Sequence, residues 1–197
     1  ADAIEKRFTK RIKNKYLLSK PNLENISFVN KLSTILKLKK NIVLKALNNF
    51  KGLPHRNEMF YNKQGISFIN DSKATSFDST QHSLKSNKNI FWIVGGMHKV
   101  NDKFKLEKVK KNIVKVYIIG QNINYFKKQI GGALEYTLSF NIENALQDII
   151  KDLFLLRQRP ATILLSPASA SYDQFDNFVE RGDHFKKMTL KYARKFI

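Results

Sequence analysis

The sequence predicts an α/β fold, a doubly wound and mainly parallel sheet preceded by a short helical region. After Pro54, short apolar runs alternate with amphipathic stretches, which is the order of strands and crossover helices. Several of these runs are apolar throughout instead of alternating, as expected of parallel strands that helices cover on both faces. Because crossovers between parallel strands are right-handed, repeated β-α-β order places helices on both sides of one sheet.

The preceding region, residues 22–50, has the apolar periodicity of helices. Apolar residues recur there at three- and four-residue steps. Pro21 stands where a start signal is expected and Gly52-Leu53-Pro54 where a stop signal is expected. We therefore expect two units, residues 1–53 and residues 54–197, and we predict no structure for residues 1–20.

Within the second unit the expected elements can be assigned in order. We expect strands at Ile66–Ile69, Ile90–Val94, Val114–Ile119, Leu134–Leu138 and Thr162–Leu165. We expect helices at Phe77–Ser86, Lys103–Lys111, Asn122–Ile130, Ile142–Gln158 and Gln174–Phe196, the last interrupted near Gly182. Asn141 precedes the fourth helix as a suitable N-cap, with Glu143 in the first turn.

The composition excludes several classes of protein. The 197 residues carry a formal net charge of +20 but no cysteine, so neither disulfides nor thiolate metal sites exist. No stretch approaches the roughly 20 apolar residues of a membrane helix, and the first residues lack a signal peptide's apolar core. We expect no membrane partner and a cytoplasmic, monomeric protein. Since the lysines are spread along the chain without a nucleic-acid-binding motif, we interpret the charge as solvated surface and expect no nucleic-acid partner.

Polar and small residues cluster at three junctions that follow predicted strands. These are Asn70-Asp71-Ser72-Lys73-Ala74-Thr75-Ser76, Gly95-Gly96-Met97-His98-Lys99, and the segment Ser166–Phe175 with three serines. In an open α/β sheet ligands bind beyond the carboxyl ends of the strands, so we expect Asn70–Thr75 and Ser166–Phe178 to face one crevice. A helix N-terminus there suits a carboxylate or a phosphate.

Each junction also has a purely structural interpretation. Ser76 or Thr75 could simply cap a helix, although a cap does not explain Asp71 together with Lys73. The Gly-Gly pair could be an ordinary turn beside a surface lysine. No phosphate-binding G-x-x-x-x-G-K-[ST] loop and no G-x-G-x-x-G motif is present, and the four histidines lack metal-ligand spacing, so we predict no metal site.

Four segments, in this order, resemble the Mur ligase family and specifically its D-glutamate-adding members. The segments are Gly52-Leu53-Pro54-His55-Arg56-Asn57-Glu58, Asn70-Asp71-Ser72-Lys73-Ala74-Thr75, Gly95-Gly96 with Lys99, and Leu164-Leu165-Ser166-Pro167-Ala168-Ser169-Ala170-Ser171-Tyr172-Asp173-Gln174-Phe175 with Arg181-Gly182. The D-N-P-[AR] motif of the diaminopimelate- and lysine-adding relatives is absent. The resemblance implies a Rossmann-like C-terminal ligase domain preceded by a helical remnant of the central ATP-binding domain.

The resemblance also implies roles for individual residues. For ATP binding it implies Asn22, Asn25, Arg56 and Asp71, although Pro21 stands where the family has a histidine. For D-glutamate binding it implies Lys73, Thr75, Lys99, Ser171, Tyr172 and Phe178, with Tyr172 replacing an aliphatic residue.

The implied reaction joins D-glutamate to UDP-N-acetylmuramoyl-L-alanine. ATP phosphorylates the carboxyl group, and the amine of D-glutamate attacks the resulting acyl phosphate to form an amide. The phosphate loop, the magnesium-binding acid and the UDP-binding domain are missing from this sequence, so the resemblance implies activity and Mg²⁺ binding for a parent enzyme. Three alternatives stay open: a ligase for another amino acid, an inert binding module, and a basic nucleic-acid binder.

Overall fold

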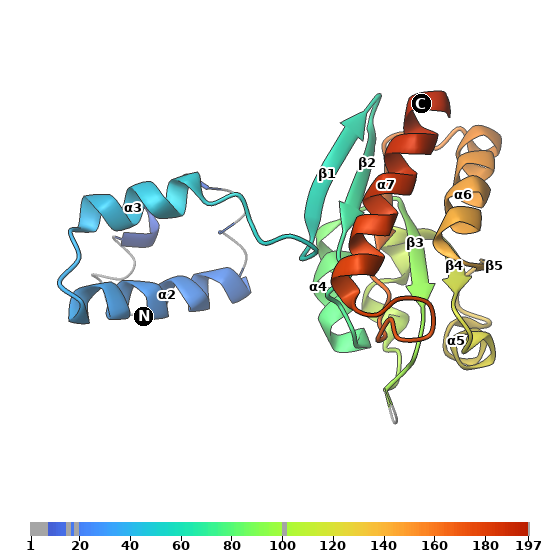
Figure 1. Ribbon diagram of the computed structural model, residues 1–197, viewed down its shortest axis with the longest axis horizontal. Coiled ribbons are helices and arrows are strands. Elements are labelled where there is room, and N and C mark those ends of the chain that lie inside the picture. Colours follow the sequence, from blue (N-terminus) through green and yellow to red (C-terminus); the bar gives the residue numbers. More distant parts are fainter. Residues whose placement is uncertain (1–7, 15–16, 18–19, 100–101, 197) are drawn as a thin grey trace. The chain divides into compact units, whose positions relative to one another are not determined.

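The computed structural model describes residues 8–14, 17, 20–99 and 102–196, which fall into two compact units (Figure 1). The division lies between Leu53 and Pro54. In the first unit, α2 (Lys20–Ile35) and α3 (Lys40–Asn49) pack against each other, as the apolar periodicity predicted. Their shared core is small and consists of Phe8, Ile12, Leu17, Ile26, Val43 and Leu44. Pro21 lies inside the first turn of α2, where proline is tolerated, and not before the helix.

The second unit is built on one six-stranded sheet. Its strands, in spatial order, are β1 (Glu58–Lys63), β2 (Ile66–Asn70), β6 (Ala161–Leu165), β3 (Ile90–Gly95), β4 (Ile113–Ile119) and β5 (Tyr136–Phe140). All neighbouring pairs are parallel except β1 and β2, which form an antiparallel hairpin. The last strand in sequence, β6, therefore lies between β2 and β3. This insertion brings the ends of three strands that are distant in sequence to one place.

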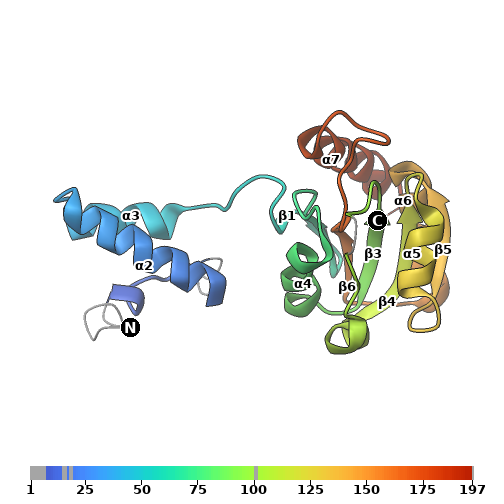
Figure 2. The same ribbon diagram turned by 90° about the horizontal axis from the view of Figure 1, so that it is seen from below.

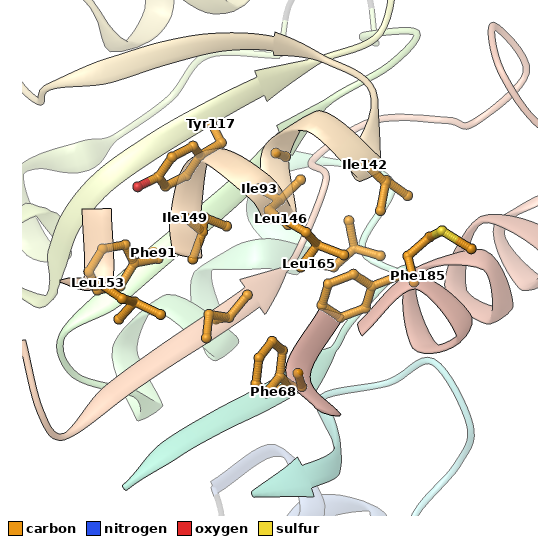
Figure 3. Close-up of a cluster of buried hydrophobic side chains, with 14 of the residues drawn as sticks. Phe68, Phe91, Ile93, Tyr117, Ile142, Leu146, Ile149, Leu153, Leu165 and Phe185 are labelled. Atoms are coloured by element: carbon orange, nitrogen blue, oxygen red, sulfur yellow. The ribbon is translucent and has the colours of Figure 1, made fainter. Parts of the chain in front are cut away.

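Helices cover both faces of the sheet (Figure 2). On one face lie α4 (Phe77–Ser86) and α5 (Ile123–Ile130), and on the other lie α6 (Ile142–Leu156) and α7 (Phe178–Phe196). Side chains of β3 alternate between the two cores, with Trp92 on the α4 and α5 side and Phe91 and Ile93 on the α6 and α7 side. Figure 3 shows the α6 and α7 core. The predicted doubly wound, mainly parallel fold is confirmed.

The helix predicted at Lys103–Lys111 is wrong. The structure has two short 3₁₀ turns there, Leu106–Lys108 and Lys110–Asn112. Leu106 and Val109 are both buried, and three-residue spacing places two side chains on one side of a 3₁₀ turn. Apolar periodicity over so short a stretch did not distinguish the two kinds of helix.

Two strand predictions also differ from the structure. The edge strand β1 was not predicted, although Gln64 and Gly65, both with positive φ, form the two-residue turn of a hairpin. The predicted strand Leu134–Leu138 is shifted by two residues from the observed β5, Tyr136–Phe140. Both errors fall at the edges of the sheet, where partial exposure weakens the apolar signal.

The last helix is uninterrupted and shorter than predicted. It begins at Phe178 and not at Gln174, because the Asn177 side chain accepts hydrogen bonds from the backbone N–H groups of Val179 and Glu180, both at 2.9 Å. Gly182 does not break it. A Cβ on Gly182 would lie 2.2 Å from Nδ1 of His55, so this glycine allows a close approach to that ring.

Candidate functional site

The three polar junctions meet at the carboxyl ends of β2, β6 and β3, which are neighbours in the sheet. The backbone N–H of Asp71 donates to the carbonyl of Leu165 at 2.8 Å, which continues the β2–β6 pairing into the loops. Met97 and Ala170 exchange two backbone hydrogen bonds, which join the loop after β3 to the loop after β6. The segments Asn70–Thr75 and Ser166–Phe178 therefore lie side by side, as their positions after parallel strands predicted.

Asp71 connects this edge of the sheet to the start of the second unit. Its Oδ2 accepts hydrogen bonds from the hydroxyls of Ser83 at 2.6 Å and Ser166 at 2.8 Å. Its Oδ1 accepts from the backbone N–H of Asn57 at 3.0 Å. The carboxyl is buried, which raises its pKa above the ordinary value, while the three hydrogen bonds and the charge of Arg56 act in the opposite direction. Asp71 thus fixes the segment that carries the exposed Arg56 side chain.

The loop after β2 leads into a well-capped helix. Ser76 is the N-cap of α4, and its hydroxyl and that of Ser79 form a capping box. Capping therefore explains Ser76, but it does not explain the exposed Lys73 and Thr75 that precede it. The ammonium of Lys73 lies 5.2 Å from the centre of the Phe178 ring, at the start of α7.

The glycines after β3 are required by the backbone itself. A Cβ on Gly95 would lie 1.9 Å from the carbonyl oxygen of Ile119, and one on Gly96 would lie 2.4 Å from that of Ala170. Both glycines also have positive φ. The Asn122 side chain donates to the Gly96 carbonyl at 3.1 Å. The loop is thus held closely against its neighbours, with an exposed Lys99 beyond it.

The loop after β6 carries Ser171 and Tyr172 in different surroundings. Ser171 is buried, whereas Tyr172 is 71% exposed. Tyr172 lines an open hollow of about 390 Å³ together with Asp173, Gln174, Phe175, Asp176 and Glu180. Three carboxylates in that wall disfavour an anionic ligand, so this hollow is a poor site for a dicarboxylate.

Arg181 is a central residue of this region to which the sequence assigned no role. It lies on the first turn of α7, and its side chain is 1% exposed. The Nε donates to the Ser72 hydroxyl at 3.0 Å, and Nη2 donates to the carbonyls of Ser72 at 2.8 Å and Ser169 at 3.0 Å. The guanidinium therefore bridges the loops after β2 and β6. Arg181-Gly182 was part of the family resemblance, but no pattern in the sequence indicated that the arginine is buried.

The two remaining predicted site residues, Asn22 and Asn25, lie in α2 of the first unit. Asn22 is half-buried and Asn25 is exposed. Among the described residues, no three histidine, aspartate or glutamate side chains gather in a way that could hold a metal ion. The described residues also include no helix that is long and apolar enough to cross a membrane.

Several curated proteins are similar to this chain. UDP-N-acetylmuramoylalanine–D-glutamate ligase of Fusobacterium nucleatum is 42% identical over 175 residues, which are 86% of this chain and 40% of that protein. The ligases of the same name from the Wolbachia of Brugia malayi and from Rickettsia felis are 35% and 32% identical, over 89% and 92% of this chain. The chain spans 35% and 40% of those two relatives. No protein-family model matches the chain.

Solved structures with the same fold include MurF of Acinetobacter baumannii, with a TM-score of 0.64 at 13% identity. That match covers 90% of this chain and 38% of the other. UDP-N-acetylmuramate–alanine ligase MurC of Thermotoga maritima matches with a TM-score of 0.55 at 15% identity, over 82% of this chain and 36% of the other. At such low identities these matches concern the fold alone.

Proposed function

This chain belongs to the Mur ligase family, and we propose that it supplies the D-glutamate site and part of the ATP site of a UDP-N-acetylmuramoylalanine–D-glutamate ligase. One observation carries the proposal. In a chain so similar to ligases of that name, three loops bearing Lys73, Thr75, Lys99 and Ser171 follow adjacent strands of one sheet. The reaction is an ATP-dependent amide-bond formation in peptidoglycan synthesis, and because the chain spans two-fifths or less of these relatives, the whole activity needs the remaining part.

The amino-acid site in this proposal consists of cations and hydroxyls. Lys99 binds one carboxylate of D-glutamate, and Thr75, before the N-terminus of α4, contributes a hydroxyl. Lys73, Ser171 and Phe178 complete the surroundings, whereas Tyr172 lines the acidic hollow described above and is given no contact with the ligand. Two carboxylates suit such a set because charge-assisted hydrogen bonds are about twice as strong as neutral ones. The unpaired N–H groups of a helix N-terminus also favour an anion.

The ATP side in this proposal involves Asn22, Asn25, Arg56 and Asp71. Arg56 offers a guanidinium suited to phosphate oxygens. Asp71 acts through its hydrogen bond to the Asn57 backbone, which fixes the neighbouring Arg56, since both of its carboxylate oxygens already accept hydrogen bonds. In this scheme Asp71 is a positioning residue.

Mg²⁺ belongs to the ATP chemistry and neutralises the charge of the transferred phosphate. The described residues offer no acidic cluster that could hold it. In this proposal the remaining part of the ligase supplies its ligands, and none of the described residues receives a metal-binding role.

Residues 1–53 are, in this proposal, a helical remnant of the central ATP-binding domain. On α2, three large apolar side chains at helical spacing are exposed: Phe28, Leu32 and Ile35. Their spacing places them on one stripe of the helix, away from the face that contributes Ile26 to the small core. An exposed apolar stripe of this kind supports the proposal that this unit normally packs against further protein.

The proposal is tested by titrating D-glutamate into the ¹⁵N-labelled chain, with L-glutamate as the control. We expect chemical-shift changes that saturate with D-glutamate and are centred on Lys73, Thr75, Lys99 and Ser171. Equal responses to both enantiomers, or changes confined to other surfaces, would contradict the proposed site. D-lysine and meso-diaminopimelate in parallel samples test the alternative of a ligase for another amino acid.

A further inference from the structure

Arg181 holds a positive charge in the interior of the second unit without a counter-ion in contact. The ion pairs found among the described residues do not include it. Burial lowers the pKa of Arg181 to about 10, and Asp173 is the one group whose charge opposes that shift. The side chain is therefore a buried cation, because even this pKa lies far above neutral pH. Burying a charge without an ion partner is costly unless something nearby compensates it.

The guanidinium binds two of the three loops of the site and lies close to the third. Nε and Nη2 bind the loops after β2 and β6 through Ser72 and Ser169. The third nitrogen, Nη1, is buried, has no hydrogen-bond partner, and lies 3.4 Å from the place where a Cβ on Gly96 would be. The Ser72 hydroxyl in turn donates to the carbonyl of Phe178 at 2.8 Å. One side chain thus joins the loops that carry Lys73 and Ser171, and its unpaired Nη1 lies beside the loop that leads to Lys99.

We propose that Arg181 is a specificity-determining positioning residue, whose uncompensated charge beneath the three loops makes the site prefer an amino acid with an anionic side chain. This inference rests on the proposed function, because it concerns the same site. Arg181 does not contact the ligand. It acts through its electrostatic potential, which is screened less inside a protein than in water, and through the loops that it holds together.

The charge and the hydrogen bonds can be separated with variants and a neutral ligand. D-glutamine has the shape of D-glutamate without the side-chain charge, so the ratio of the two affinities reports the electrostatic preference. Arg181→Met removes the charge, whereas Arg181→Lys keeps it and loses the planar fork of donors. Lys187→Met is the matched control, since it removes one exposed charge from the same helix.

We expect Arg181→Met to reduce the preference for D-glutamate over D-glutamine about tenfold, as measured by NMR titration of the whole chain. Arg181→Lys should bind both ligands more weakly but keep the preference within about threefold, and Lys187→Met should leave both affinities unchanged. Equal losses for both ligands in Arg181→Met would overturn the inference while leaving the proposed D-glutamate site intact. A wild-type chain that binds no D-glutamate would overturn the proposed function and this inference together.

A measurement on the wild-type chain does not depend on the variants folding. The Nε–H of Arg181 is buried and hydrogen-bonded to Ser72, so its ¹H–¹⁵N signal should persist at neutral pH. We expect D-glutamate at saturation to shift this signal more than D-glutamine does. A signal that stays in place at saturation with D-glutamate would overturn the inference.

Discussion

At the scale of single residues, some polar side chains of the candidate site are exposed to solvent, whereas others are buried and fix the positions of the loops. Lys73 and Thr75 follow β2, Lys99 follows β3, and all three side chains are exposed. Asp71 and Arg181 are buried beneath them and are fully engaged in hydrogen bonds, apart from the unpaired Nη1 of Arg181. The exposed residues are therefore candidates for ligand contact, and the buried ones are candidates for positioning.

Lys99→Ala tests the exposed group. In a complete ligase that contains this sequence, the variant should lose about tenfold in apparent affinity for D-glutamate, because a charge-assisted contact is lost. Its apparent affinity for ATP should not change. Lys103→Ala removes an exposed lysine of the same segment and is the control. The assignment of Lys99 is refuted if its variant and this control have the same D-glutamate dependence.

Asp71→Asn tests the buried carboxyl through the pH dependence of stability. Since burial raises its pKa above the ordinary 3.8, the folded protein keeps this proton to a higher pH than the unfolded chain does. The contribution of Asp71 is therefore fully present below the unfolded-state pKa and declines as pH rises through the folded-state pKa. Relative to Asp71→Asn, the wild type should lose free energy of unfolding as pH rises from below 3.8 through the raised pKa of the folded state, as measured by urea denaturation.

The control for this series is Asp78→Asn, which removes an exposed carboxylate from the neighbouring helix. A wild-type advantage over Asp71→Asn that grows with rising pH would contradict the argument. It would mean that the hydrogen bonds from Ser83, Ser166 and Asn57 outweigh the cost of burial.

At the scale of elements, α7 contains a glycine where it packs closely against His55, near the start of the second unit. Gly182 faces His55, whose ring also approaches Phe178 edge-on and lies 3.0 Å from the Asn70 side chain. The ring is buried and held from two sides, so it cannot easily move away. At Gly182, helix propensity therefore favours alanine, whereas the close packing against His55 favours glycine.

Gly182→Ala should destabilise the protein by about 1–3 kcal/mol, the usual cost of overpacking a core. In an open helix the same change would stabilise by roughly 1 kcal/mol. His55→Gly removes the obstructing ring and suits the positive φ of that position. In this background Gly182→Ala should become neutral or stabilising in thermal unfolding. Equal effects in both backgrounds would show that His55 is not the cause.

At the scale of the whole molecule, the second unit has its own hydrophobic core, but the chain spans less than half the length of the curated relatives it matches. Two apolar cores, one on each face of the sheet, give residues 54–197 a complete sandwich of layers. The net charge of +20 is distributed over the sequence, and the absence of a nucleic-acid partner stays a prediction. The D-glutamate and ATP roles stay proposals.

The 197-residue chain by itself should catalyse no net ligation. Phosphoryl transfer depends on positioning and on charge neutralisation by a phosphate loop and Mg²⁺, and this sequence contains no such loop. The measurement is phosphate release with ATP, Mg²⁺, UDP-N-acetylmuramoyl-L-alanine and D-glutamate, compared with a complete ligase. Turnover by the isolated chain that depends on D-glutamate would contradict this prediction.

The sequence by itself determined the fold class, the central strands and the segments that meet at the candidate site. Continuous apolar runs such as Ile90–Val94 predict buried parallel strands, and strand order along the chain predicts which loops share an edge. The elements that it missed, β1 and the two 3₁₀ turns, are short and half-exposed, so their local signals are weak.

Only the tertiary structure decided what the polar residues of those segments do. Whether Asp71 faces solvent or three hydrogen-bond donors depends on Asn57, Ser83 and Ser166, which are far from one another in sequence. The same holds for Arg181, whose burial results from the insertion of β6 between β2 and β3. Periodicity reports which face of an element is apolar, but the partners of a polar side chain are set by contacts between distant segments.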